Sequence, residues 1–299
     1  MTTTKFAKLS TAFTEYFGRN AIERLQSDVK TPAILIAGHQ LTGKSTMAKR
    51  LATIYNGGQF YSVGSMFREL ASSLNMSVAK QSRLLLDLQL HEQGKWDGSY
   101  DIKQNPLYGR RVDIELDYRT CQIVQGIDKQ QPRNMYSVIE GRQPALIGNF
   151  IQNIYDRENL LKIYVKCNVR DKSIRFLERE VGKECAAIAE QQLPLDLDLD
   201  DMAAVVGHLS SLPLPNIDKV VEQFIENQHR DQDDRNRYME LYGLDYEASQ
   251  FYDFIVDTSN ETAANNLRKV TDFIDSLDRD NTVPTSLKNI KPLLGSPRL

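Results

Sequence analysis

Residues 33–46 decide the fold, and they read Ala-Ile-Leu-Ile-Ala-Gly-His-Gln-Leu-Thr-Gly-Lys-Ser-Thr. The first five residues are an uninterrupted apolar run, which is typical of a buried strand in a parallel sheet. The next eight fit the pattern G-x-x-x-x-G-K-[ST], and a helical pattern follows from Met47 to Tyr55. A strand before such a loop and a helix after it are the context that a phosphate-binding loop requires.

The residue types of this loop each have a chemical reason. Gly38 lets the chain turn sharply out of the strand, and Gly43 lets backbone N–H groups approach phosphate oxygens. Lys44 reaches the β- and γ-phosphates, Ser45 supplies a hydroxyl ligand for Mg²⁺, and the helix start adds its positive end. We therefore expect ATP and Mg²⁺ as cofactors. The expected cofactor-binding residues are Gly38, His39, Gln40, Leu41, Thr42, Gly43, Lys44, Ser45 and Thr46.

The composition narrows the class of protein. The chain has 299 residues, 41% hydrophobic and 26% charged, which is near the globular average and excludes wholesale disorder. A net charge of −3 argues against a nucleic-acid binder. No apolar run reaches the roughly 18 residues of a membrane span, and the first residues lack the apolar core of a secretory signal. Three widely spaced cysteines without a CxxC favour a reducing, cytoplasmic setting. We therefore expect neither nucleic acid nor membrane as a partner, and protein partners stay open.

Short apolar runs alternate with helical patterns along the chain. This alternation predicts an α/β fold with a parallel five-stranded sheet, whose ligands bind at the carboxyl ends of the strands. The predicted strands are 33–37, 60–63, 136–140, 161–166 and 253–257, and the predicted helices that follow the first loop and helix are 66–74, 112–124, 172–180, 217–242 and 261–277.

Arginines gather after the predicted strands. Phosphoryl transfer needs two phosphate groups positioned in line with their charge neutralised, and the planar guanidinium binds phosphate through two hydrogen bonds. These arginines are Arg68 after the second strand, Arg142 after the third, Arg175 and Arg179 after the fourth, and Arg230, Arg235 and Arg237 on the long helix. No NKxD motif of a switch GTPase is present. The pattern therefore predicts an enzyme that moves a phosphoryl group onto a small acceptor.

The sequence resembles the cytidylate kinases of the nucleoside monophosphate kinase group, and it is similar above all to their archaeal-type branch. Four segments carry the resemblance: the loop at 37–46, Tyr-Ser-Val-Gly-Ser-Met-Phe-Arg-Glu-Leu-Ala at 61–71, Val-Ile-Glu-Gly-Arg at 138–142, and 230–259. The last segment contains Arg-Asp-Gln-Asp-Asp-Arg-Asn-Arg-Tyr, Leu-Tyr-Gly-Leu-Asp and Tyr-Asp-Phe-Ile-Val-Asp-Thr-Ser. The resemblance implies a three-layer P-loop kinase fold and transfer of phosphate from ATP to CMP or dCMP.

The resemblance also divides the chain. It implies a helical extension over 1–31, a kinase-like domain over 32–278 with insertions near 93–105 and 186–216, and a flexible tail over 279–299. The tail has Lys288, Lys291 and Arg298 but no acidic residue after Asp280.

The same resemblance assigns roles by position. The implied catalytic residues are Lys44, Arg175 and Arg179, the two arginines forming a lid together with Lys172. The implied substrate-binding residues are Arg68, Arg142, Arg230, Asp234 and Arg237. Ser45 and Glu140 would hold Mg²⁺.

Departures from the family pattern leave alternatives open. Val63 and Gln143 replace residues near the acceptor, so a kinase for another small phosphorylated or hydroxyl acceptor stays possible. An ATP-binding regulatory module without efficient turnover is the other alternative. Leu41 replaces a small residue and either narrows the pocket or packs outward, and His39 is expected to be a loop residue with an exposed ring.

Overall fold

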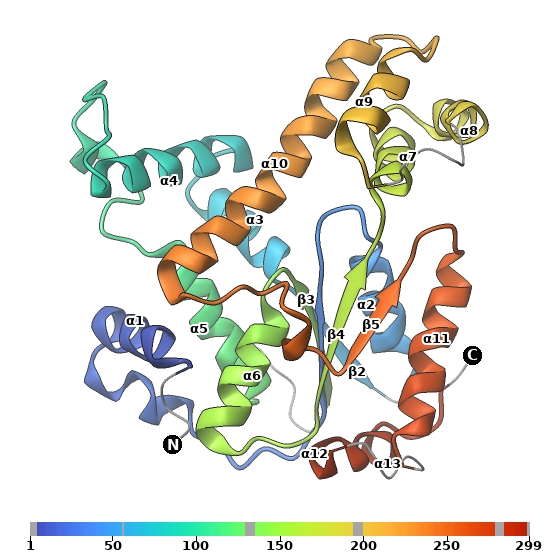
Figure 1. Ribbon diagram of the computed structural model, residues 1–299. Helices are drawn as coiled ribbons and strands as arrows, with labels where there is room; N and C mark the ends of the chain where they lie inside the picture. Colours follow the sequence, from blue (N-terminus) through green and yellow to red (C-terminus); the bar gives the residue numbers. More distant parts are fainter. Residues whose placement is uncertain (1–4, 56, 129–134, 194–199, 279–283, 298–299) are drawn as a thin grey trace.

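The computed structural model describes residues 5–55, 57–128, 135–193, 200–278 and 284–297. Within these ranges a parallel sheet of five strands, in the order β2-β3-β1-β4-β5, forms the centre of the molecule (Figure 1). The strands are β1 (Ala33–Ala37), β2 (Gly58–Ser62), β3 (Tyr136–Gly141), β4 (Leu160–Lys166) and β5 (Phe254–Asp257). The predicted α/β class with a parallel five-stranded sheet is confirmed.

Helices cover both faces of the sheet, so alternate residues of β1 pack into two different apolar cores. Ala33 and Leu35 pack with the helices of one face, and Ile34 and Ile36 pack with those of the other. The first face is covered by α1 (Ala7–Phe17), α5 (Val112–Val124) and α6 (Pro144–Tyr155), and the second by α2 (Lys44–Ile54) and α11 (Ala263–Ser276). None of the helices in the described ranges is long and apolar enough to cross a bilayer.

Two helices and a loop, which we call the helical arm, follow the edge strand β2. It contains α3 (Val63–Ser73) and α4 (Val78–Glu92), and then a loop with the short turn η3 (Ile102–Gln104). The expected insertion near 93–105 corresponds to this loop. The sequence pattern does not predict α4 as a helix. Its consecutive leucines at 84–86 do not mark a single helical face, and the residues that α4 buries are the polar Gln81 and Asp87.

Four helices above the sheet share an apolar cluster of their own (Figure 1). They are α7 (Val169–Glu180), α8 (Lys183–Gln192), α9 (Met202–Ser210) and the long α10 (Ile217–Tyr242). The cluster includes Phe176, Leu177, Val205, Leu209 and Phe224. The expected insertion near 186–216 therefore supplies much of this unit, although its residues 194–199 lie outside the described ranges. We refer to α7–α10 as the lid, after the role predicted for it.

The first and the last described segments of the chain both pack on the core. In the expected helical extension over 1–31, α1 ends at Phe17, because Gly18 adopts a φ of +92° and the turns η1 (Arg19–Ala21) and η2 (Glu23–Leu25) follow it. The prediction of a flexible tail over 279–299 is wrong for the described residues 284–297. They form α12 (Thr285–Lys288) and α13 (Ile290–Leu294), and burial of apolar side chains at helical spacing explains this order. These buried side chains are Leu287, Ile290 and Leu294.

Substitution of Ile290 by alanine tests this packing. Ile290 is fully buried, so Ile290→Ala should lower the free energy of unfolding by about 2–4 kcal/mol through lost burial and a residual cavity. Leu293→Ala is the matched control, because Leu293 is 49% exposed three residues away. Urea denaturation followed by circular dichroism measures both, and equal stabilities for the two variants would contradict the packing described.

Candidate functional site

The loop at 38–46 lies at the carboxyl end of β1 and turns directly into α2. Gly38 has a φ of +154°, and a Cβ added there would lie 2.3 Å from the carbonyl oxygen of Val165 in β4. Gly43 precedes the first residue of α2 in the left-handed region, with a φ of +85°. Leu41 shares that region with a φ of +63° although it carries a side chain. That side chain packs outward against the apolar cluster of the lid.

Lys44 folds back over this loop. Its Nζ donates a hydrogen bond to the carbonyl oxygen of His39 at 2.9 Å, and the Thr42 hydroxyl donates to the same oxygen at 2.9 Å. Burial lowers the pKa of Lys44, while the charges of Glu140 and Asp231 act in the opposite direction. The ammonium therefore has a carbonyl oxygen as its partner, which a phosphate oxygen could replace.

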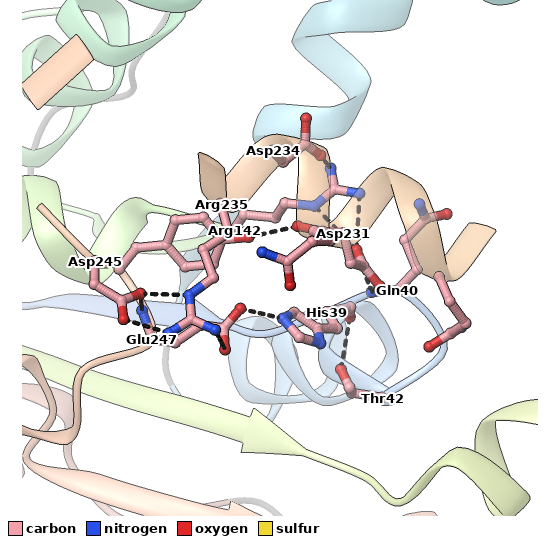
Figure 2. Close-up of polar contacts among 12 residues, drawn as sticks. His39, Gln40, Thr42, Arg142, Asp231, Asp234, Arg235, Asp245 and Glu247 are labelled. Carbon is pink, nitrogen blue, oxygen red and sulfur yellow. Dashed lines mark hydrogen bonds and ion pairs between the residues drawn. The ribbon is translucent and has the colours of Figure 1, made fainter. Parts of the chain in front are cut away.

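An acidic residue of α10 reaches the same loop (Figure 2). The carboxylate of Asp231 is 2% exposed and accepts a hydrogen bond from the backbone N–H of Gln40, with N–O distances of 3.2 and 3.3 Å. Arg142 donates to Asp231 Oδ1 from Nε at 3.1 Å and from Nη2 at 2.9 Å. Its Nη1 pairs with Asp234. The charges of Asp234 and Asp231 raise the pKa of Arg142 although burial opposes them.

Further acidic and basic side chains alternate beside these, from α10 to the start of α5. Arg237 pairs with Asp234, one turn away, and its Nε lies 2.8 Å from Asp113 Oδ2 in the first turn of α5. The nearby carboxylates raise the pKa of Arg237 against the effect of burial. Two guanidiniums, Arg142 and Arg237, each bridge two carboxylates within this series. We call it the charged series, comprising Asp113, Arg237, Asp234, Arg142 and Asp231.

A buried carboxylate fixes α10 beneath the charged series. Asp117 of α5 is fully buried and accepts hydrogen bonds from Tyr238 and Tyr242, each at 2.7 Å, and from Gln143 Nε2 at 2.9 Å. Desolvation raises the pKa of Asp117 to about 7, although all three donors act to lower it. The amide of Gln143 is thus held by Asp117 and ties α6 to α5.

The lid contributes Arg175 to the loop. Its Nη1 donates to the carbonyl oxygen of Leu41 at 3.0 Å and to Thr258 Oγ1 at 3.0 Å, and its Nη2 donates to the Thr258 carbonyl oxygen at 2.7 Å. Arg179, by contrast, pairs with its exposed neighbour Glu180 at 2.6 Å and lies 5.4 Å from the ring centre of Phe176. The structure therefore brings only the first of the two predicted lid arginines to the loop.

The expectation of an exposed His39 ring is wrong. Its side chain is 22% exposed, and Nε2 lies 2.6 Å from Glu247 Oε1 in the segment after α10 (Figure 2). On its other side Nδ1 lies 3.4 Å from Lys172 Nζ. The loop, the lid and the segment after α10 thus meet at this ring.

Two predicted substrate-binding arginines lie outside the charged series. Arg68 on α3 is exposed and its Nη2 donates to Ser65 Oγ at 2.8 Å. Arg230 on α10 is exposed and forms no ion pair within the described part of the chain. Their roles stay predictions.

The candidate magnesium residues are a neighbour of Lys44 in the sequence and a carboxylate whose charge acts on it. Ser45 is in the first turn of α2, and Glu140 is buried near the end of β3, where it accepts a hydrogen bond from the Ser62 hydroxyl. No group of three or more histidine, cysteine or acidic side chains that could hold a metal ion occurs among the described residues. Mg²⁺ commonly takes one or two protein oxygens and completes its shell with water and phosphate. A hydroxyl and a carboxylate beside a phosphate loop fit that requirement.

Four residues of the site are absent from the predicted set. Asp231 lies inside the arginine-rich motif of the long helix, three residues before the predicted Asp234. Asp113 and Asp117 are one helical turn apart on α5, which was a usable signal for two polar side chains on one face. Glu247 pairs with a residue 208 positions away, so no local pattern could have indicated it.

Comparison with known proteins gives a consistent result. No family model matches the chain. It is 25% identical over 244 residues to a cytidylate kinase of Desulfurococcus amylolyticus, covering 81% of this chain and 93% of that protein. A cytidylate kinase of Staphylothermus marinus is 23% identical over 242 residues, covering 81% and 96%. A solved but uncharacterized protein from Eubacterium ventriosum is 15% identical with a TM-score of 0.45, covering 83% of this chain and 99% of that chain. The chain is thus a distant relative of the cytidylate kinases, and the resemblance noted in the sequence is confirmed.

The pKa of Asp117 predicts a pH-dependent stability. Because its folded-state pKa of about 7 exceeds the ordinary value of 3.8, the folded chain binds more protons between these values. The contribution of Asp117 to stability should therefore fall as the pH rises from about 4 to about 7, by at most about 1.4 kcal/mol per pH unit. Asp117→Asn should remove this slope, as measured by urea unfolding across that range. Asp272→Asn, at an exposed position of α11, should keep it, and an unchanged slope in Asp117→Asn would contradict the assignment.

Proposed function

We propose that the chain is a nucleoside monophosphate kinase that transfers the γ-phosphoryl group of ATP, with Mg²⁺, to CMP or dCMP. The observation that carries the proposal is the charged series, which starts at the phosphate loop with Asp231 and presents two arginines beside it. A loop for one phosphate group and guanidiniums for a second are what phosphoryl transfer requires. The names of the distant relatives support a cytidine nucleotide as the acceptor.

On the donor side, the loop from Gly38 to Thr46 would hold the phosphates of ATP through its backbone N–H groups. Lys44 would leave the His39 carbonyl oxygen and stabilise charge on the γ-phosphoryl group as it moves. Ser45 and Glu140 would hold Mg²⁺. When bound, the ion neutralises charge on the β- and γ-phosphate oxygens.

On the acceptor side, the phosphate of the nucleotide would compete with carboxylates for guanidiniums. Arg142 and Arg237 each bridge two carboxylates, so one can be exchanged for a phosphate without leaving the guanidinium unpaired. A carboxylate so released, such as Asp234, becomes free to accept hydrogen bonds from hydroxyl or amino groups of the acceptor. Arg68 and Arg230 are exposed and their long side chains would turn toward the same acceptor.

The lid would complete the reaction site. Arg175 already contacts the Leu41 carbonyl oxygen, and Lys172 lies beside His39. Arg179 would join them on closure, leaving its exposed pair with Glu180, which contributes little to stability. Closure excludes water, which keeps the γ-phosphoryl group from hydrolysis and reserves it for the acceptor.

The proposed location is the cytoplasm. Its support is the cysteine content, because Cys121, Cys167 and Cys185 are all free thiols and two of them are buried. Free, buried thiols suit a reducing compartment.

A coupled assay of ADP release against a panel of acceptors tests the activity. CMP and dCMP should stimulate ADP release, and Lys44→Ala should lower kcat by about 100-fold or more, because it removes a charge aimed at the transferred group. Lys49→Ala, on an exposed position of α2, is the control and should keep the wild-type rate.

The panel also separates the alternatives. Stimulation by a different phosphorylated or hydroxyl acceptor alone would select a kinase of other specificity. Binding of ATP without stimulation by any acceptor would select a regulatory module, and both results would refute the proposed reaction.

Arg237→Lys tests the acceptor side. Lysine keeps the charge and loses the planar fork, so the KM for CMP should rise about tenfold while the KM for ATP changes less than about twofold. Arg230→Ala should act in the same direction, and Arg50→Lys, exposed on α2, should change neither constant. Steady-state kinetics with each substrate varied measures both constants. Equal increases in both KM values for Arg237→Lys would contradict a role of this arginine in acceptor binding.

A further inference from the structure

The second residue of the phosphate loop is a histidine with two polar neighbours from distant parts of the chain. His39 Nε2 lies 2.6 Å from Glu247 Oε1, and His39 Nδ1 lies 3.4 Å from Lys172 Nζ. Glu247 is itself held by Arg235 of α10, whose Nη1 lies 3.4 Å from Glu247 Oε2. The imidazole therefore belongs to a chain of polar contacts that connects α10, the loop and the lid helix α7.

The chemistry of the neighbours fixes the protonation of the ring. A lysine ammonium only donates hydrogen bonds, so His39 Nδ1 has to be the acceptor and carries no proton. Glu247 is a carboxylate that accepts, so the proton of the neutral ring lies on Nε2. A doubly protonated ring would turn an N–H toward the ammonium and repel it. With Lys172 as the donor to Nδ1, the neutral ring therefore carries its proton on Nε2, facing Glu247.

Lys172 is the second neighbour of the His39 ring and a buried cation. It is 6% exposed, and its second contact is Gln228 Oε1 at 3.5 Å. It forms no ion pair with any residue in the described ranges. Lys172 lines a cavity of about 200 Å³ together with His39, Thr42 and Asn168, and Lys166, Asp200 and Asp257 line it as well. A buried cation at such a cavity is stabilised by a nearby anion, which the phosphoryl group in transfer would supply in the closed site.

We propose that His39 is a positioning residue, whose neutral imidazole holds the ammonium of Lys172 at the edge of the phosphate loop, toward the phosphoryl group in transfer. The proposal rests on the proposed function. Glu247 acts one step further out, because it holds the proton on the far nitrogen of the ring and so keeps Nδ1 free to accept. The pairing joins the lid to the loop by a contact that protonation breaks.

The charges around the ring decide how protonation acts. They are Glu247 and Arg235 from α10 and the segment after it, Asp231 from α10, Lys172 from α7, Lys44 from α2, and Lys166, Asp200 and Asp257 around the adjoining cavity. Glu247 would stabilise an imidazolium, whereas Lys172 faces it directly and opposes it. Protonation at acidic pH should therefore be accompanied by departure of Lys172 from the loop.

Enzyme kinetics on His39→Gln provides the first test. Glutamine cannot titrate, so kcat should fall about tenfold near neutral pH, as expected for one lost charge-assisted hydrogen bond, while the KM for the acceptor changes less than about twofold. The decline of kcat on the acidic side should also become shallower than in the wild type. The acceptor phosphate titrates near pH 6 in every variant alike, so the difference between profiles isolates His39. His91→Gln, exposed on α4, should match the wild type. An unchanged acidic limb in His39→Gln would overturn the proposal.

Nitrogen-15 NMR of the histidine rings provides a test that needs no turnover. At about pH 7.5 the wild-type His39 should be neutral with its proton on Nε2. In Lys172→Met, which preserves an unbranched side chain, Glu247 should keep this tautomer, and the nitrogen-15 resonance of the unprotonated Nδ1 should shift because its hydrogen-bond donor is lost. A proton on Nδ1 in the wild type, or an unchanged Nδ1 resonance in Lys172→Met, would overturn the proposal. If no acceptor stimulates ADP release, the proposed function fails, and the Nδ1 resonance still decides whether His39 holds Lys172.

Discussion

The contact on which the site depends is the one between Asp231 and the phosphate loop. This carboxylate accepts from the Gln40 N–H and from Arg142, so a single buried group joins β1, β3 and α10. An unpaired carboxylate in this position would be costly, and so would an unpaired Arg142. Each therefore stabilises the other, and together they hold the long helix over the loop. Under the proposed function, a phosphate would compete with this carboxylate for the same donors.

The other contacts of α10 follow from that arrangement. Below the charged series, Asp117 anchors Tyr238 and Tyr242, which fixes the rotation of the helix about its axis. With that rotation set, Asp231 and Asp234 face Arg142. At its other end, α10 carries Phe224 into the apolar cluster of the lid. One helix thus belongs both to the static core and to the lid, and the polar groups of the site lie between its two apolar ends.

The sequence predicts correctly those strands and helices that are specified by their own residues. The strand at 33–37 and the helices at 112–124 and 217–242 have the predicted bounds, because apolar runs and helical spacing specify them without help from the rest of the chain. Several helices were not predicted, α4 and α6 among them. In α6 Gly148 and a nearly continuous apolar face obscure the period, and a Cβ at Gly148 would lie 2.1 Å from Leu35 Cδ1, so the glycine serves close packing on β1. The contacts of His39 depend on the tertiary fold alone.

The outward turn of Leu41 has a thermodynamic consequence for the lid. A leucine at a φ of +63° is strained by about 1–2 kcal/mol relative to a glycine, and its contact with the apolar cluster offsets that strain only while the lid is close to the loop. Any opening of the lid exposes this side chain to water. Exposure of apolar surface carries a positive heat-capacity change. The balance between open and closed lids in this protein should therefore vary with temperature along a curve rather than a straight line, unlike that of a relative whose loop has only glycine at this position.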